Sequence, residues 1–179
     1  MFVRCPLLYN MIRGCFNTIT AKLDEWHSQD LRFFPFAPDE FINSLKFNLG
    51  KLAHANYQIW HYEDIAKVGK DDAEVLKAYK MTVVFNRQRN QATEAIEQHF
   101  FSLQKDVGEI CSETMGMIFD RLSILYLKKL HARDIDPQKV SLLEVQIEGL
   151  LEAADNLYKG ICEGTKRSLI FSHLKIYSG

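Results

Sequence analysis

The stretch at residues 112–131 constrains the fold most, because its apolar residues do not fit a helix with only one buried side. Seven of them form one wide face of a helical wheel: Met115, Ile118, Phe119, Leu122, Leu125, Tyr126 and Leu130. Three more lie on the opposite side: Met117, Ile124 and Leu127. A helix that is apolar on more than one side is usually buried between neighbours, so this stretch predicts the central helix of a bundle.

Residues 39–69 are predicted to form a long helix with a heptad seam. Asp39, directly after Pro38, is the expected N-cap, and Gly69 ends the helix. Seven residues spaced four and three apart form the seam: Leu45, Leu49, Leu52, Asn56, Ile59, Glu63 and Ala66. Asn56 and Glu63 therefore stand at positions where a heptad core prefers leucine or isoleucine.

Residues 72–105 predict a second long helix, capped by Asp71 or Asp72. Its seam has the same spacing: Val75, Tyr79, Thr82, Asn86, Arg89, Thr93, Ile96, Phe100 and Leu103. The ends of this seam are apolar and its middle is polar. Two facing helices with polar residues in mid-seam predict a hydrophilic pocket inside the bundle.

The remaining segments complete an all-α pattern. Pro6 opens a first helix, and an aromatic loop at residues 28–38 is expected to pack its phenylalanines over one end of the core. Asp136-Pro137 starts a last long helix with an unbroken apolar stripe. No β-alternation of useful length is present, and residues 168–177 stay unassigned apart from an expected docking on the bundle.

The length of 179 residues suits one domain. We therefore predict a single all-α helical bundle of about five helices, with two long antiparallel helices and a buried central helix. Residues 1–38 form its N-terminal helix and aromatic loop, and residues 39–178 form the rest of the bundle.

Composition excludes several classes of function. The net charge of −1 and the pI of about 6.6 give no basic surface for nucleic acid. No apolar run approaches the roughly 20 residues that cross a bilayer, and the N-terminus makes a poor signal-peptide core. The four cysteines are too scattered for a zinc site and too few for a disulfide scaffold. These features favour a cytoplasmic protein without membrane insertion.

No metal site is predicted. A ferritin-like site needs Glu-x-x-His on two helices, and no histidine here has a glutamate three residues before it. Glu94 with Glu97 and Glu152 with Asp155 imitate the paired carboxylates of helical nucleotide pyrophosphohydrolases, but such spacings are common by chance on exposed helices.

Helix counting predicts which polar residues of the two long helices meet. In an antiparallel pair that turns near Lys70, residues whose numbers sum to about 140 lie level, so Asn56 can reach Asn86. His54 and His61 fall on the side of their helix away from the seam, so we expect both to face solvent.

The same counting about Gly108 sets Asp120 and Arg121 level with Ile96 and Glu97. Burying Asp120 and Arg121 is costly unless each has a partner. We therefore expect both to be paired within the protein, the arginine with Glu97 or a neighbouring acid.

Two interpretations of the polar residues stay open. In one, they only fix helix register within a non-enzymatic interaction module, whose mark would be an exposed apolar patch, for example on residues 138–163. In the other, they form a pocket for a small anionic ligand such as a phosphorylated metabolite. Six residues would line it: Asn56, Asn86, Arg89, Asn90, Asp120 and Arg121.

Within such a pocket, Arg89 or Arg121 would hold a phosphate or carboxylate group. Glu63 or Asp64 would serve as acid or base if the bound ligand is also transformed. The sequence names neither a reaction nor a cofactor, and it leaves the oligomeric state open, a homo-oligomer included.

Three blocks of sequence together resemble a known family. They are residues 56–64 (NYQIWHYED), residues 86–90 (NRQRN) followed by Glu97, and residues 112–128, with a closing match at residues 174–177. In this order they resemble the uncharacterised bacterial domain-of-unknown-function family 4254 over roughly residues 38–178. The resemblance implies an all-helical fold and brings no established activity, substrate or cofactor. The family pattern has an aspartate where this chain has Val83, so a catalytic role of that aspartate would be missing here.

Overall fold

The computed structural model describes residues 6–37, 42, 44–133 and 135–169, with the side chains of residues 6–10 left aside. The described residues contain five helices: α1 Pro6–Ser28, α2 Leu45–Val68, α3 Asp72–Phe101, α4 Met115–Ala132 and α5 Pro137–Glu163. The predicted all-α bundle is confirmed.

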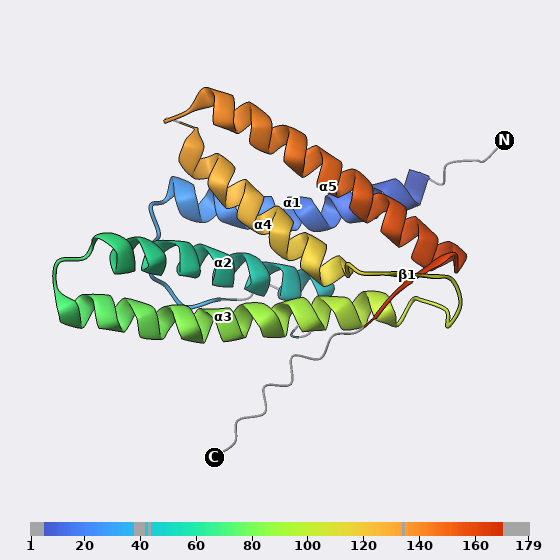
Figure 1. Cartoon of the computed structure of the whole chain (residues 1–179), viewed down its shortest axis with the longest axis horizontal. Helices are drawn as coiled ribbons and strands as arrows, with labels where there is room; N and C mark the ends of the chain where they lie inside the picture. Colours follow the sequence, from blue (N-terminus) through green and yellow to red (C-terminus); the bar gives the residue numbers. More distant parts are fainter. Residues whose placement is uncertain (1–5, 38–41, 43, 134, 170–179) are drawn as a thin grey trace, which may run out of the picture.

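Helix α4 is the centre of the bundle, as its sequence predicts. It packs against all four other helices, whereas α2 and α3 form an antiparallel hairpin beside it. Figure 1 shows α4 crossing α2 obliquely, so that it meets α3 only near its own N-terminal end. This divergence leaves the N-terminal half of α3 packed against α2 alone among the described helices.

Side-chain caps begin four of the helices. Ser44 Oγ accepts from the Phe47 amide at 3.0 Å, and Thr114 Oγ1 accepts from the Met117 amide at 3.2 Å. Asp71 and Asp136 cap α3 and α5 in the same way. Each such cap stabilises a helix by about 1 kcal/mol. The predicted start of α2 at residue 39 is wrong, because Ser44 is the cap; Asp39 itself lies outside the described residues.

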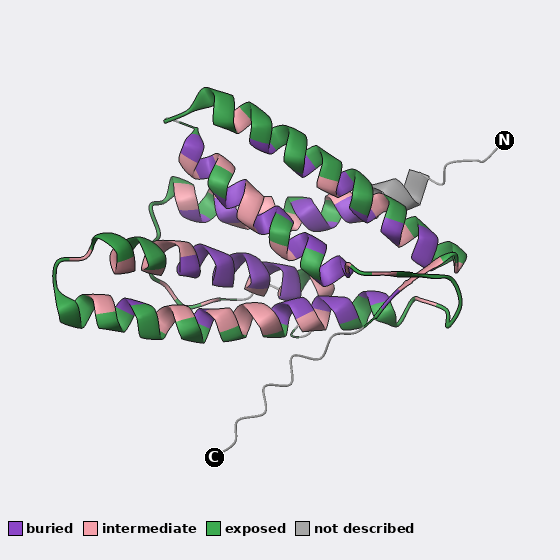
Figure 2. Ribbon diagram, in the orientation of Figure 1, coloured by how far each residue is buried: buried purple, intermediate pink, exposed green. Residues whose placement is uncertain are grey.

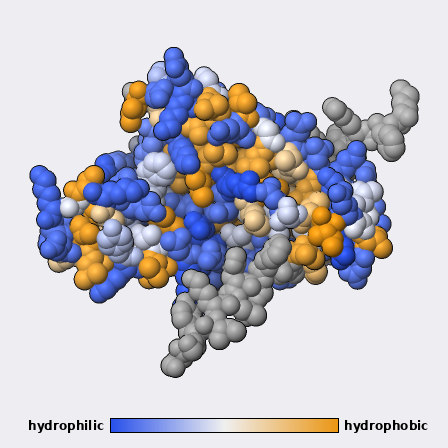
Figure 3. Space-filling view, in the orientation of Figure 1, coloured by the Kyte–Doolittle hydropathy of each residue, from blue (hydrophilic) through white to orange (hydrophobic). Residues whose placement is uncertain are grey.

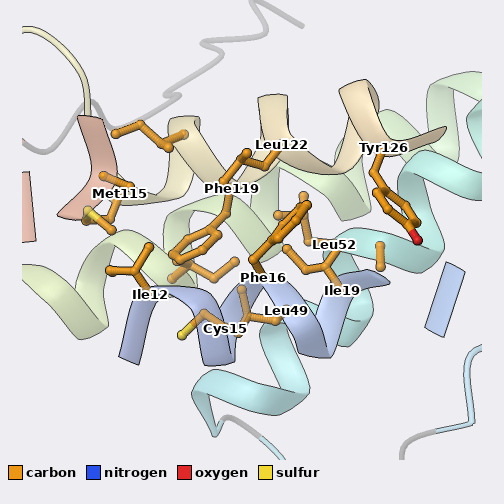
Figure 4. Close-up of a cluster of buried hydrophobic side chains, with 14 of the residues drawn as sticks. Ile12, Cys15, Phe16, Ile19, Leu49, Leu52, Met115, Phe119, Leu122 and Tyr126 are labelled. Carbon is orange, nitrogen blue, oxygen red and sulfur yellow. The ribbon is translucent and has the colours of Figure 1, made fainter. Parts of the chain in front are cut away.

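All five helices contribute to the hydrophobic core, and Figure 4 shows the part of it where side chains of α1, α2 and α4 interleave. Ile19 of α1, Leu52 of α2 and Phe119 of α4 are completely buried. Truncating Phe119 to alanine would cost about 3–5 kcal/mol. Along α1, Ile12, Cys15, Ile19, Leu23 and Trp26 are buried, and their spacing places them on one face of the helix.

Helix α2 is buried on every side along residues 52–59, which Figure 2 shows as a continuous purple segment. The predicted exposure of His54 is therefore wrong: only 2% of this residue is accessible. The rings of Phe34 and Phe36 lie 5.0 and 5.5 Å from its ring. Its Nε2 lies 2.9 Å from the Phe34 carbonyl oxygen. The aromatic loop thus covers the side of α2 that the heptad seam leaves outside.

A short parallel pair of strands, β1 Glu109–Cys111 and β2 Lys166–Ser168, was not expected from the sequence. Gly108 precedes β1 with a positive φ of 107°, and a Cβ atom there would lie 2.6 Å from the backbone of Thr165. The side chain of Gln104 extends the pair by bonding both the N–H and the C=O of Ser168, at 3.0 and 3.1 Å. Three-residue strands are too short to leave an alternating pattern in the sequence.

The remaining boundaries largely follow the sequence. Helix α3 ends at Phe101 rather than at residue 105, because Ser102 closes it. Helix α5 begins after its Asp136 cap and ends at Gly164, which has the left-handed conformation expected of a helix C-cap. The expected docking of residues 170–177 lies outside the described residues.

Candidate functional site

Asn56 is the centre of a buried group that we call the amide cluster, formed by Asn56, Asp120 and Ser123. The Nδ2 group of Asn56 donates to Asp120 Oδ1 at 2.9 Å and to Ser123 Oγ at 2.5 Å. Both N–H bonds of the amide are therefore used on α4, and Asn56 and Ser123 are buried. The predicted contact of Asn56 with Asn86 is replaced by this contact with α4.

Arg89 links α3 to the amide cluster. Its Nε lies 3.8 Å from Asp120 Oδ1, and the side chains of Arg89 and Asp120 are 29% and 21% exposed. This separation is longer than the 2.7–2.9 Å of a charge-assisted hydrogen bond. The pair is thus an ion pair at the edge of the interior, with one side open to solvent.

The prediction set Asp120 of α4 level with Ile96 of α3, but Asp120 contacts Arg89 instead. Helix α4 is therefore shifted along α3 by seven residues, about 10 Å, from the predicted register. Gly116 fixes this register, because a Cβ atom there would lie 2.5 Å from the Thr93 carbonyl oxygen. The counting failed because the connection is not a tight turn about Gly108. The connecting segment instead runs away from α3 to form β1, and the chain returns to α3 beside Thr93 at the start of α4.

Arg121 and Asp120 are both paired, as predicted. Arg121 forms its ion pair with Glu113, a neighbouring acid, and not with Glu97. Glu97 is buried and instead accepts a hydrogen bond of 2.5 Å from Thr114 Oγ1. The N-cap residue of α4 is in this way tied to α3.

Asn86, Arg89 and Asn90 lie along one side of α3 and are all half-buried. Among the described residues, the side-chain amides of Asn86 and Asn90 have no hydrogen-bond partner, and the ion pair with Asp120 is the only one of Arg89. These three residues, which we call the donor strip, therefore retain unused N–H groups beside the amide cluster.

Glu63 does not occupy the inner position that the seam predicted, and neither it nor Asp64, the other candidate acid or base, lies inside the bundle. Both are exposed, and Glu63 lies 3.1 Å from Lys67 in an ordinary surface ion pair. The reason is the length of α4: it ends at Ala132, and His131 stacks on Trp60 at 4.6 Å. Glu63 is one helical turn beyond that contact, where α4 no longer covers α2.

A family model described as "Protein of unknown function (DUF4254)" matches residues 48–170. The chain belongs to this family. Neither the curated proteins nor the solved structures give a match. The matched DUF4254 region contains the amide cluster, the donor strip, Arg121, Glu63 and Asp64. The resemblance drawn from the three sequence blocks is thus confirmed.

A second polar group, of which only His61 and His131 lie in the DUF4254 region, was missed by the sequence reasoning. His27 of α1, His61 of α2 and His131 of α4 form what we call the histidine cluster, with His131 ring centroids 5.2 Å from His27 and 5.8 Å from His61. The Nε2 atoms of His61 and His131 are buried without a hydrogen-bond partner among the described residues. The predicted exposure of His61 is wrong, because Tyr57 and His131 flank its ring.

Burial is the largest cause of the lowered pKa values of His61 and His131. It lowers the pKa of His61 to about 4, helped by the positive charges of His131, Arg32 and His27 and opposed by Asp64. Burial likewise lowers the pKa of His131, with His27 and Arg32 acting in the same direction and Asp64 against it. No sequence signal identifies this cluster, since its members come from three helices that are far apart in the chain.

In the part of the chain that the structure describes, no group of three or more His, Cys, Asp or Glu residues could hold a metal ion. No helix in this part has the length and apolar character needed to span a membrane.

Proposed function

We propose that the chain binds a small anionic ligand, such as a phosphorylated metabolite, at the donor strip of α3. The observation that carries this proposal is the set of unused donors on Asn86, Arg89 and Asn90. Half-buried N–H groups without acceptors are costly to desolvate, and a phosphate or carboxylate would supply the acceptors. Arg89 would hold the anion through its guanidinium, and the two amides would orient it.

The amide cluster has a positioning role in this proposal. Asn56 holds Asp120 from one side, and Asp120 attracts Arg89 from the other. Because the Arg89–Asp120 contact is loose, the guanidinium can turn toward an anion without breaking a short hydrogen bond. Arg121 stands near the same end of α4 as a second cation, although Glu113 already neutralises it.

An acid or base role of Glu63 or Asp64 stays a prediction, as does the cytoplasmic location. Both carboxylates are solvent-exposed on the last turns of α2. If either takes part in a reaction, the reacting group of the ligand must lie toward that end of the helix. Binding is therefore the part of the function that the geometry supports best.

The alternative is an interaction module whose buried polar residues only fix helix register. It is favoured by the amide cluster, since Asn56 uses both of its N–H bonds inside the protein. A buried asparagine that fixes register behaves in this way. The donor strip separates the two functions, because register alone requires no unused donors on α3.

Thermal melts with added anions test the proposal. Inorganic phosphate, nucleotides and sugar phosphates would each be compared with potassium chloride at equal ionic strength, with and without magnesium. A ligand present at 100 times its dissociation constant stabilises the folded state by about 2.7 kcal/mol. We expect at least one phosphorylated compound to raise the melting temperature beyond the salt control.

The matched variants are Arg89→Gln and Lys77→Gln. Lys77 is exposed on the same helix, makes no ion pair among the described residues and lies about 18 Å along the axis from Arg89, so its loss removes an equal charge away from the site. Arg89→Gln should abolish the ligand shift and Lys77→Gln should retain it. An equal effect of both variants, or no shift with any anion, would reject the proposed site.

A further inference from the structure

The N-terminal half of α3 carries an exposed apolar stripe formed by Leu76, Tyr79 and Val83, which we call the α3 stripe. These residues are three and four apart and so share one side of the helix. They are 55%, 58% and 70% exposed. Figure 3 shows apolar surface at the end of the molecule where the α2–α3 turn lies. Isolated apolar residues are normal on a protein surface, but an aligned set indicates a contact surface.

The α3 stripe continues a face of α3 that α4 covers further along. Asn90 and Glu97 follow Val83 at intervals of seven residues and therefore lie on the same side of α3. Glu97 is buried where Gly116 of α4 packs against it. Helix α4 then turns away toward α1 and α2 (Figure 1), so no described helix covers the stripe.

We propose that the α3 stripe binds the same stripe of a second copy of this chain, with the two α3 helices antiparallel. A two-fold axis near Tyr79 sets Leu76 of each copy level with Val83 of the other. The same axis sets Asp72 level with Arg87 of the partner, and both residues are exposed. Neither forms an ion pair among the described residues of its own chain. The surface therefore meets its copy with apolar residues along the stripe and with opposite charges at both ends of it.

This charge pattern favours an antiparallel second copy over the other partners that could cover the α3 stripe. A parallel pair would place Arg87 on Arg87 and Asp72 on Asp72, which repel. An anionic membrane would attract Lys80 and Arg87 but would repel the acidic first turn with Asp72 and Glu74. The antiparallel copy satisfies both ends of the stripe at once. Self-complementary contacts of this kind are the rule in two-fold dimers.

Light scattering coupled to size-exclusion chromatography tests the proposal on the full chain. The expected mass of the wild type is about twice the chain mass of 20.8 kDa. The matched variants are Val83→Asp and Val145→Asp, because these valines are 70% and 71% exposed, on α3 and α5 respectively. Val83→Asp should give the monomer mass and Val145→Asp should leave the dimer intact. Far-UV circular dichroism should show unchanged helix content for both.

Charge reversal tests the antiparallel arrangement itself. Asp72→Arg and Arg87→Asp should each raise the dissociation constant of the dimer about ten-fold or more at low salt. The double variant should return it close to the wild-type value, because the pair is restored with its charges exchanged. A wild-type monomer at every concentration measured overturns the proposal. So does a dimer broken by Val145→Asp, or a double variant as weak as the single ones.

Discussion

The amide cluster and the histidine cluster both place polar groups between helices, but they differ in how those groups are satisfied. In the amide cluster, each N–H bond of Asn56 has an acceptor on α4. In the histidine cluster, the Nε2 atoms of His61 and His131 are buried without a partner among the described residues. Burial of a polar group is costly unless it is hydrogen-bonded. The first cluster therefore stabilises one packing of the helices, and the second makes stability depend on proton concentration.

The difference teaches that burial alone does not assign a role to a polar residue. Asn56 donates to Asp120, and Asp120 pairs with the half-buried Arg89. A buried asparagine whose N–H groups are all bonded can therefore still influence the donor strip. The histidines are surrounded instead by aromatic rings, with Trp60 stacked on His131. Aromatic neighbours bury the imidazoles but accept no conventional hydrogen bond. Protonation is the event to which such a cluster responds.

The largest expected effect comes from Asn56→Leu. The leucine removes the donor to Asp120 and Ser123 and leaves both oxygens facing an apolar side chain. We expect a loss of about 3 kcal/mol in the free energy of unfolding. That corresponds to a fall of roughly 6–12 °C in melting temperature for a domain of this size. Calorimetry at pH 7.5 measures it, and a change below the scatter of repeated scans would show that the cluster contributes little.

A smaller effect is expected from titrating the histidine cluster. The pKa values of His61 and His131 are lowered on folding, so the unfolded chain binds protons more readily than the folded chain. The stability present above about pH 6.5 should therefore be lost as the pH falls toward 4. The loss is at most about 1.4 kcal/mol per pH unit for each proton.

His61→Leu tests this pH dependence and His99→Leu is its control, since His99 is exposed on α3. Leucine cannot be protonated, so the first variant should lose less stability than the wild type between pH 6.5 and 4.5. The control should follow the wild-type curve. Parallel curves for the wild type and His61→Leu would show that the acid sensitivity originates elsewhere in the protein.

The fold was predictable where a pattern is local to one helix. Residues 112–131 contain their own evidence of burial on several sides, and the structure makes them the central helix. The Asp136-Pro137 start also needs no information from elsewhere in the chain. Asn56 and Asp120 stood out as polar residues beside apolar ones, which need a partner wherever that partner lies, and the structure bonds the two to each other.

The failures concern how helices are placed against each other. The helical wheel of α2 assumed one buried side, but the aromatic loop covers a second, so His54 is inside. The register of α3 and α4 was wrong because β1 lies in their connection, and three-residue strands leave no sequence pattern. Glu63 is exposed because α4 ends before it could cover this residue, and the sequence of α2 contains no information on the length of α4.

The smallest expected effect is that of Glu63→Leu, which shows how an exposed seam residue differs from both clusters. The side chain of Glu63 is 49% exposed, and its only ion-pair partner among the described residues is Lys67, one turn away on the same helix. Such pairs contribute about 0.3–0.5 kcal/mol, so the melting temperature should change by no more than about 1–2 °C. A fall of 6 °C or more would reveal a structural partner that the exposed position gives no reason to expect. The anion-induced shift in melting temperature, measured on the same variant, separates ligand binding from a catalytic role of Glu63. Because Glu63 lies away from the donor strip, the shift should persist even if a catalytic activity of the protein depends on this carboxylate.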